Sequence, residues 1–388
     1  MKYGRVQQDN GRKELWMQFF EADSPDTAKE YRVVSWTVGN CNLVITVPHG
    51  GTVGSDTSPA GNLVCQSGNI LETRKGTIAC RIGTYTRDAG TEVIAADMLD
   101  ILSQEGLRPH VVECHVHRSK VECNRDLTEI AVQEPGKEGE FIYSMFHGWI
   151  SEAVEMGRMS GDVPGVLLVD LHGHGHTHDY IELGFRLKGE LLNEISNDKV
   201  NHPSKLQSNF PELTVLKSFS KIDTDLNPKM DNCHDKVEHR DWTSIVTSSA
   251  RHEFTMRHLL KRRFGTNNES IKEALIGDAS FSGCISNQLA KTEILSDVQC
   301  LPSLARPYPG RLGYYTGGYI VKRHAKGKRV DSVQVELPMS VRTQADERRK
   351  AVTLALAHGI QEFYKLHYSE LRHTTNGSLA SKDVTFLD

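Results

Sequence analysis

The stretch "GVLLVDLHGHGHTHDY" (165–180) decides the fold, because a near-continuous apolar run leads directly into four alternating histidines. The run at 165–171 is typical of a strand that is covered on both faces in a parallel sheet. Histidines at 172, 174, 176 and 178 follow at once. Residues of this kind after a buried strand form either a polar surface loop or a metal site at the carboxyl end of the strand.

The segments before this stretch alternate between strand and helix patterns. Runs rich in Val, Ile and Thr predict strands at 33–38, 42–47 and 110–117, and broad apolar faces predict helices at 88–106 and 141–157. Together with the strand at 165–171, this order predicts an α/β fold with a mixed, largely parallel sheet.

The pattern loosens after this part of the chain. Residues 190–305 are rich in Asn, Asp and Lys, and we interpret them as an insertion or subdomain within a single catalytic domain spanning 1–388. Regular structure is expected again at 317–324, in a strand at 332–338 and in a long helix within 343–366, followed by a loose tail at 373–388.

Bulk composition excludes several classes of protein. The chain has 388 residues and a formal net charge of -4, which does not favour a general nucleic-acid binder. The one dense basic run, "RHLLKRRF" (257–264), is interpreted as a solvated helix face. No segment approaches the ~20 apolar residues of a membrane span, and no signal peptide is evident. Eight cysteines without a CxxC pair read as reduced thiols, so we expect a cytoplasmic protein; its oligomeric state stays open.

Chemically active residues follow three of the predicted strands. His49 follows the strand at 42–47, Arg118, Lys120, Asn124 and Arg125 follow the strand at 110–117, and His172 follows the strand at 165–171. Each residue alone has an ordinary reading as a loop residue. Ligands bind beyond the carboxyl ends of strands in open α/β sheets, and zinc suits imidazoles with a carboxylate. The convergence therefore predicts a metal site.

Five motifs carry a family resemblance. In order they are "VPHGG" (47–51), "HRSKVECNRD" (117–126), "LLVDLHGHG" (167–175), "YTGGYI" (315–320) and "VQVELP" (333–338). They resemble the N-formylglutamate amidohydrolase (deformylase) family, which is distantly similar to zinc carboxypeptidases and aspartoacylases. The resemblance covers about 40–365, without a counterpart for 190–305, and implies a three-layer α/β/α fold.

The resemblance implies one Zn²⁺ per chain. His49 and His172 would be ligands. Carboxypeptidase-like enzymes usually take their carboxylate from an His-x-x-Glu motif, but position 52 is Thr here. The implied substitute is Asp88, before the helix at 88–106, with Glu92 as the alternative.

The remaining implied roles concern substrate and proton transfer. Asn124 and Arg125 match a pair that grips a substrate carboxylate, and Glu336 matches the catalytic glutamate. Arg118 or Lys120 would assist an oxyanion or a second carboxylate, and Thr316 is a weaker contact candidate. His174 shares the parity of His172 and would be a second-shell residue or alternative ligand. We expect His176, His178 and Asp179 at the rim.

These roles predict a zinc-dependent hydrolase of a linear amide. Its substrate would be an N-formyl or N-acyl amino acid, or a similar small molecule bearing a carboxylate, with water activated by Glu336. The alternative is a non-catalytic descendant of the same fold that binds a ligand or a partner protein. Thr at position 52 and the predicted insertion favour that alternative, whereas the joint presence of His49, His172 and Glu336 speaks against it.

Overall fold

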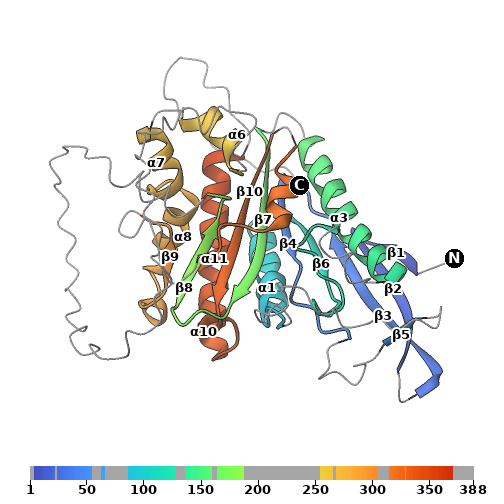
Figure 1. The fold of residues 1–388 in the computed structure, drawn as a ribbon. Coiled ribbons are helices and arrows are strands. Elements are labelled where there is room, and N and C mark those ends of the chain that lie inside the picture. Colours follow the sequence, from blue (N-terminus) through green and yellow to red (C-terminus); the bar gives the residue numbers. More distant parts are fainter. Residues whose placement is uncertain are drawn as a thin grey trace, which may run out of the picture.

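A computed structural model describes ten ranges of the chain (Figure 1). They are 4–21, 24–54, 63–65, 86–127, 136–159, 164–187, 254–264, 268–303, 314–327 and 329–369. The expected loose tail at 373–388 and residues 190–253, 265–267 and 304–305 of the expected insertion lie outside these ranges.

The core is a ten-stranded mixed sheet with strand order β1-β2-β3-β6-β4-β7-β10-β8-β9, and β5 pairs with β2. The strands are β1 Arg5–Asp9, β2 Arg12–Glu21, β3 Ser24–Thr37, β4 Leu43–Val47, β5 Leu63–Cys65, β6 His110–Cys114, β7 Val166–His174, β8 Tyr180–Gly184, β9 Gln299–Leu301 and β10 Val330–Pro338. The four central strands β6, β4, β7 and β10 are parallel. The predicted α/β fold with a mixed, largely parallel sheet is therefore confirmed.

Helices cover both faces of this sheet and complete three layers (Figure 1). They are α1 Thr91–Gln104, α3 Gly136–Met159, α6 Arg257–Leu259, the π-helix η3 Leu260–Phe264, α7 Asn268–Ile276, α8 Phe281–Leu289, the 3₁₀ turn η4 Glu293–Leu295, α9 Tyr319–His324, α10 Met339–Arg342 and α11 Asp346–His367. One hydrophobic core lies between the sheet and α1, α8 and α11. The other lies beneath α3 and α9.

Strand β7 is longer than the sequence predicted. Its expected end was residue 171, but it continues in register with β10 as far as His174, which lies opposite Pro338. His172 and His174 are therefore strand residues, and both are buried. The β10 backbone provides hydrogen-bond partners for the β7 backbone up to His174, so the strand continues through its polar residues.

Helix α1 begins and ends at glycines with left-handed backbone conformations. Gly90 has φ 89° at the N-cap, and Gly106 has φ 80° just past the C-cap. The amide of Leu107 donates to the carbonyl of Leu102 at 2.9 Å, which closes the last turn. These fixed ends hold the loop before α1, which carries Asp88, against the sheet.

Part of the expected insertion packs on the main sheet. Strand β9 pairs with β8, and α8 packs against α11 within the same hydrophobic core. In the basic run at 257–264, Lys261 and Arg263 are exposed, while the Arg262 guanidinium lies 5.1 Å from the Tyr368 ring centroid. The domain boundaries remain a prediction. Among the described helices, none is both long and apolar enough to cross a membrane.

Candidate metal centre

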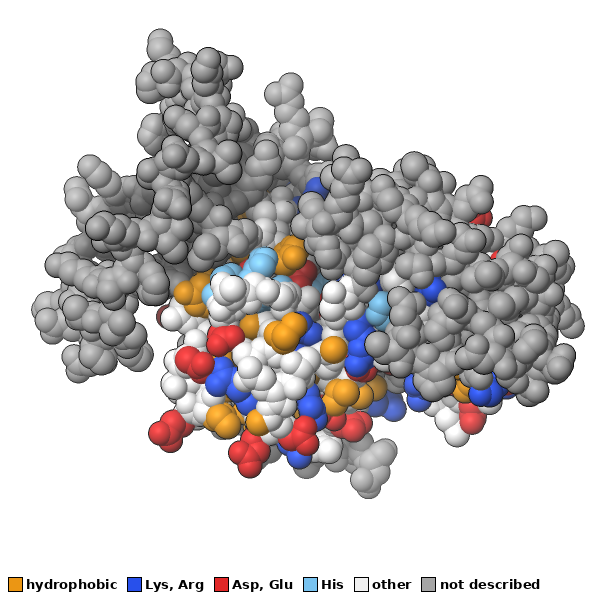
Figure 2. Space-filling model, turned by 60° about the horizontal axis from the view of Figure 1, so that its bottom comes forward, with side chains coloured by type: hydrophobic (Ala, Val, Ile, Leu, Met, Phe, Trp, Pro, Cys, Tyr) orange, Lys and Arg blue, Asp and Glu red, His pale blue; other side chains and the backbone are white. Residues whose placement is uncertain are grey.

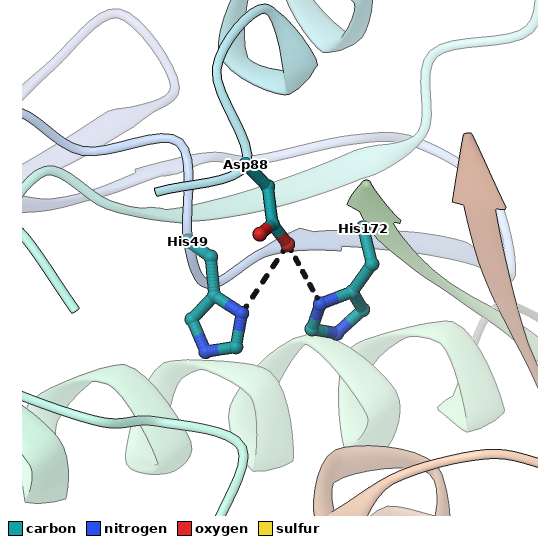
Figure 3. Close-up of side chains that lie close together, drawn as sticks. All are labelled: His49, Asp88 and His172. Atoms are coloured by element: carbon teal, nitrogen blue, oxygen red, sulfur yellow. Dashed lines mark hydrogen bonds and ion pairs between the residues drawn. The ribbon is translucent and has the colours of Figure 1, made fainter. Parts of the chain in front are cut away.

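Three buried side chains from separate parts of the chain meet at the carboxyl edge of the sheet. His49 follows β4, Asp88 precedes α1 and His172 lies in β7. One carboxylate oxygen, Asp88 Oδ2, lies 3.3 Å from His49 Nδ1 and 3.1 Å from His172 Nδ1 (Figure 3). The ligand atoms of the three residues all lie within 4.8 Å of one another, so one ion could contact all three.

Local backbone contacts place these side chains. The Asp88 amide donates to the His49 carbonyl at 3.0 Å, which joins the two loops. Gly51 packs directly on the backbone of His115 beside β6, where a Cβ atom would overlap it. Gly51, the second glycine in "PHGG", is therefore required for the turn that follows His49.

The Nε2 atom of each histidine lies against a second buried carboxylate. His49 Nε2 lies 2.5 Å from Glu122 Oε1, and His172 Nε2 lies 2.9 Å from Asp170 Oδ2. A carboxylate only accepts, so with an ion in place each Nε2 would keep its proton and each Nδ1 would turn its lone pair to the ion beside Asp88. Carboxylate–histidine pairs of this kind orient the imidazoles that bind metals in proteins.

The electrostatics of the centre favour a bound positive charge. Burial alone would lower the pKa of His172, but the carboxylates of Asp170 and Asp88 raise it well above the ordinary value. Burial would likewise raise the pKa of Asp88, but the imidazoles of His172 and His49 and the Arg118 guanidinium hold it well below its ordinary value. A divalent cation would occupy the place where these carboxylates otherwise attract a proton.

The donor set fits a metal ion. His49 Nδ1 is buried and makes no hydrogen bond of acceptable geometry among the residues described. A metal at this position would satisfy that nitrogen. Two imidazoles and one carboxylate match the ligands of catalytic zinc sites, which keep a further position for water or substrate. The structure thus supports the predicted site for a metal ion, with Asp88 beside His49 and His172 as a possible ligand.

Glu336 lies on the next strand beside the candidate ligands. In the parallel pairing of β10 with β7 it is directly opposite His172, so both side chains project from the same face of the sheet. Gln334 Nε2 donates to Glu336 Oε1 at 2.6 Å. Burial raises the pKa of Glu336 to about 7, with a smaller contribution from the neighbouring Asp88 carboxylate.

Both the candidate ligands and Glu336 line a cavity of about 800 Å³. Five other predicted site residues line it as well, namely Arg118, Asn124, Arg125, His174 and Thr316. Asn124 Nδ2 lies 3.3 Å from His172 Nε2, and its Oδ1 accepts from the Ile320 amide at 2.9 Å. Their roles towards a substrate remain predictions.

The two cationic candidates differ in what they already bind. The Arg118 guanidinium donates to Glu122 at 2.8 Å and to Asp88 at 3.3 Å. Arg125 is exposed at the cavity, and no ion-pair or hydrogen-bond partner for its side chain occurs in the described ranges. Arg125 is thus the better placed of the two to meet an anionic ligand. Lys120 is buried and does not line this cavity.

The alternative carboxylate ligand lies apart from the histidines. Glu92 binds Arg87 at 3.1 Å and accepts from the Gly90 amide at 3.0 Å, so it stabilises the first turn of α1. Asp88 rather than Glu92 completes the group. The rim interpretation of His176 and His178 is incomplete, because both contact the fully buried Glu182.

Several residues of the centre escaped the sequence reasoning. Asp170 and Glu122 hold the two histidines, and Arg342 donates to the carbonyls of Leu337 at 3.0 Å and His174 at 3.1 Å and also to Ala89. Arg342 thereby joins the ends of β10 and β7 to the loop that carries Asp88. Asp170 had a signal in the sequence, because a charged residue two positions before His172 faces the same side of the strand. Glu122 and Arg342 had none.

Comparison with known proteins adds little. No protein-family model matches the chain, and no curated protein matches it. One solved structure, "The crystal structure of gene product Atu2144 from Agrobacterium tumefaciens", is similar at 10% sequence identity with a TM-score of 0.39. The match covers 86% of this chain and 95% of that chain, and is too weak to bear on function.

Proposed function

We propose that this protein is a zinc-dependent hydrolase of linear amides, acting on N-formyl or N-acyl amino acids or similar small molecules that bear a carboxylate. The observation that carries the proposal is the pair of histidines whose Nδ1 atoms meet at Asp88, with Glu336 directly opposite one of them. A zinc ion held by His49, Asp88 and His172 would supply Lewis-acid activation of the amide carbonyl and of water.

Glu336 is suited to transfer the proton in this reaction. Its carboxylate would accept a proton from the attacking water and deliver it to the amide nitrogen as the C–N bond breaks, so that carboxylic acid and amine leave. A pKa raised by burial to about 7 matches that double role near neutral pH. Its neighbour Gln334 holds the carboxylate by a hydrogen bond of 2.6 Å.

Arg125 and Asn124 are proposed to recognise the substrate carboxylate. A guanidinium can bind both oxygens of a carboxylate at once, and that of Arg125 has no partner in the described part of the chain. The cavity volume of about 800 Å³ is within the range of small-molecule sites. A small amide with a free carboxylate fits this chemistry.

The first experiment is metal analysis combined with a substrate panel. Wild type and a His49→Asn/His172→Asn variant are compared by mass spectrometry, with His358→Asn, a half-exposed histidine paired with Glu105, as the matched control. The double variant should hold one metal fewer per chain than wild type and the control. The panel pairs N-formyl and N-acetyl amino acids with their carboxamide analogues, which lack the negative charge.

Hydrolysis of the acids but not of the carboxamides, lost in the double variant, is the expected result. Metal-loaded wild type that binds panel compounds without turnover would instead identify a non-catalytic binding protein. Equal turnover of acids and carboxamides would contradict the role of Arg125.

A further inference from the structure

A second group of imidazoles surrounds a buried carboxylate at the junction of β7 and β8. His174, His176 and Glu182 offer ligand atoms within 4.8 Å of one another, and His178 Nε2 lies 3.3 Å from Glu182 Oε1. Figure 2 looks towards this end of the sheet and shows histidine side chains gathered at the surface there. The close group thus has two imidazoles and one carboxylate, and His178 adds a third imidazole that contacts the same carboxylate.

The hydrogen bonds show which ring nitrogens of the group could turn to an ion, although the His174 Nδ1 lone pair would first have to give up a bond from a backbone amide. His174 Nε2 lies 2.7 Å from the Tyr180 carbonyl, which can only accept, so the proton is on Nε2. His174 Nδ1 then receives only a 3.2 Å hydrogen bond from the His176 amide. His178 Nδ1 is buried and has no hydrogen-bond partner within the ranges described. A backbone carbonyl that fixes one ring nitrogen is the usual support of a metal-binding histidine.

Glu182 is the anchor of the group. It is fully buried, which is costly for a carboxylate without compensation. Its Oε2 accepts from the Tyr315 amide at 2.9 Å, while Oε1 lies 2.7 Å from His176 Nδ1. The Tyr315 ring stacks on the His176 ring at a centroid distance of 4.9 Å, so Tyr315 contacts both the imidazole and the carboxylate of the group.

The group lies beside the first centre, and His174 and His176 line the same cavity, but its carboxylate is on a different strand. Glu336 on β10 lies opposite His172 on β7 and also opposite Glu182 on β8, so the three residues form a row across three strands. Two strand spacings put the backbones of His172 and Glu182 roughly 10 Å apart across the sheet. Paired metals that share ligands lie only about 3.5–4 Å apart. Two independent ions are therefore compatible with the row, one on each side of Glu336.

We propose that His174, His176, His178 and Glu182 form a second divalent-metal site of the zinc class, closed and structural. Four protein donors complete a tetrahedral zinc shell, whereas the first centre offers three and leaves one position open. An ion here would pin the β7–β8 connection and Tyr315 beside the cavity. The competing arrangement is a hydrogen-bonded histidine–glutamate network without metal. The second site does not depend on amide hydrolysis at the first.

The test uses the full chain, stripped with a chelator and titrated with zinc, with stoichiometry read by native mass spectrometry. Wild type should bind two ions, and both His176→Asn/His178→Asn and His49→Asn/His172→Asn should bind one. The combined variant should bind none, and the His358→Asn control should bind two. Affinity at the altered site should fall by at least about 100-fold, since even second-shell losses cost 10–100-fold.

Thermal unfolding provides a second readout that does not require activity. In the His49→Asn/His172→Asn background, zinc should still raise the unfolding temperature, because a ligand that binds only the folded state stabilises it. Adding His176→Asn and His178→Asn should abolish that increase. One ion in wild type, retained in His176→Asn/His178→Asn and lost in His49→Asn/His172→Asn, would overturn the second site and leave the first intact.

Discussion

The two ends of strand β10 bury carboxylates in opposite circumstances. Asp331, near the start, is saturated: its Oδ1 accepts from the His258 and Leu259 amides at 2.9 and 3.1 Å, and its Oδ2 accepts from the Tyr368 hydroxyl at 2.9 Å. Glu336, five residues later, has Gln334 as its hydrogen-bond donor in the described part of the chain and faces the large cavity.

Burial raises the pKa of both groups, to about 6 for Asp331 and about 7 for Glu336. The pKa therefore does not separate them; the partners do. A carboxylate whose oxygens are taken by amides and a hydroxyl holds structure together. One that keeps an oxygen towards a cavity, opposite a candidate metal ligand, is available for chemistry.

Glu336→Gln should show the largest functional difference between the two buried carboxylates. The amide keeps the shape and the contact with Gln334 but cannot take a proton, so kcat/KM on the hydrolysed panel substrate should fall by about 10²–10⁴-fold. The metal content and the midpoint of unfolding in denaturant should stay as in wild type. Steady-state kinetics and metal analysis on one preparation measure both.

Asp331→Asn is the matched control for that substitution, because it makes the same chemical change at the other end of the strand. Its kcat/KM should remain within about twofold of wild type. Equal losses in the two variants would mean that Glu336 acts through the strand and not through proton transfer.

Asp331→Ala should carry the next largest effect, on stability. The substitution leaves two buried amides and a hydroxyl without an acceptor. Each such group costs about 1–3 kcal/mol, so the free energy of unfolding should drop by roughly 3–5 kcal/mol. Urea unfolding followed by circular dichroism measures it. A drop below about 1 kcal/mol would show that the Asp331 contacts are dispensable.

Much of the fold could be predicted because the strands that build it are buried on both faces. The β4 run "LVITV" and the β7 run are apolar almost throughout; both were located, although β7 continues past its predicted end at residue 171 to His174. Of the antiparallel edge, the strand predicted at 33–38 lies in β3, but β1 and β2 were not predicted. The β1 segment "RVQQD" is exposed along its whole length, so no hydrophobic periodicity marks it as a strand. Its pairing with β2 comes from backbone hydrogen bonds, which composition does not reveal.

The residues of the candidate centre also fall into those that the sequence could locate and those that it could not. His49 and His172 could be located because each follows a buried strand, and strand ends meet at one edge. Glu122 and Arg342 reach the centre from a loop and from the short helix α10, and their contacts depend on how distant segments pack. No local pattern encodes those contacts. The position of Glu182 opposite Glu336 likewise needed the β8–β10 register.

The pH dependence of stability sharpens the role of Asp331. Its pKa of about 6 lies above the ordinary 3.8, so the folded protein holds this proton more tightly than the unfolded chain. That contribution is full below about pH 4 and is lost as the pH rises to 6, on the order of 2–3 kcal/mol. Asp331→Asn should flatten the profile between pH 4 and 6 in urea titrations. An unchanged slope would assign it to other groups.

The smallest effect is expected from Thr46→Val, two contacts away from the first centre. Thr46 lies opposite Asp170 in the β4–β7 pairing and donates its hydroxyl to Asp170 Oδ1 at 2.6 Å, while Asp170 Oδ2 binds His172. Losing the hydroxyl frees Asp170 to rotate, so zinc affinity at the first centre should weaken by about tenfold. Competition with a chromophoric chelator measures it, in the His176→Asn/His178→Asn background to isolate one ion. Thr353→Val removes a buried hydroxyl whose one partner in the described ranges is the Arg349 carbonyl in α11, and should leave affinity unchanged. Equal affinities in the two variants would mean that Asp170 holds His172 without help from β4, and that the sheet alone fixes the imidazole.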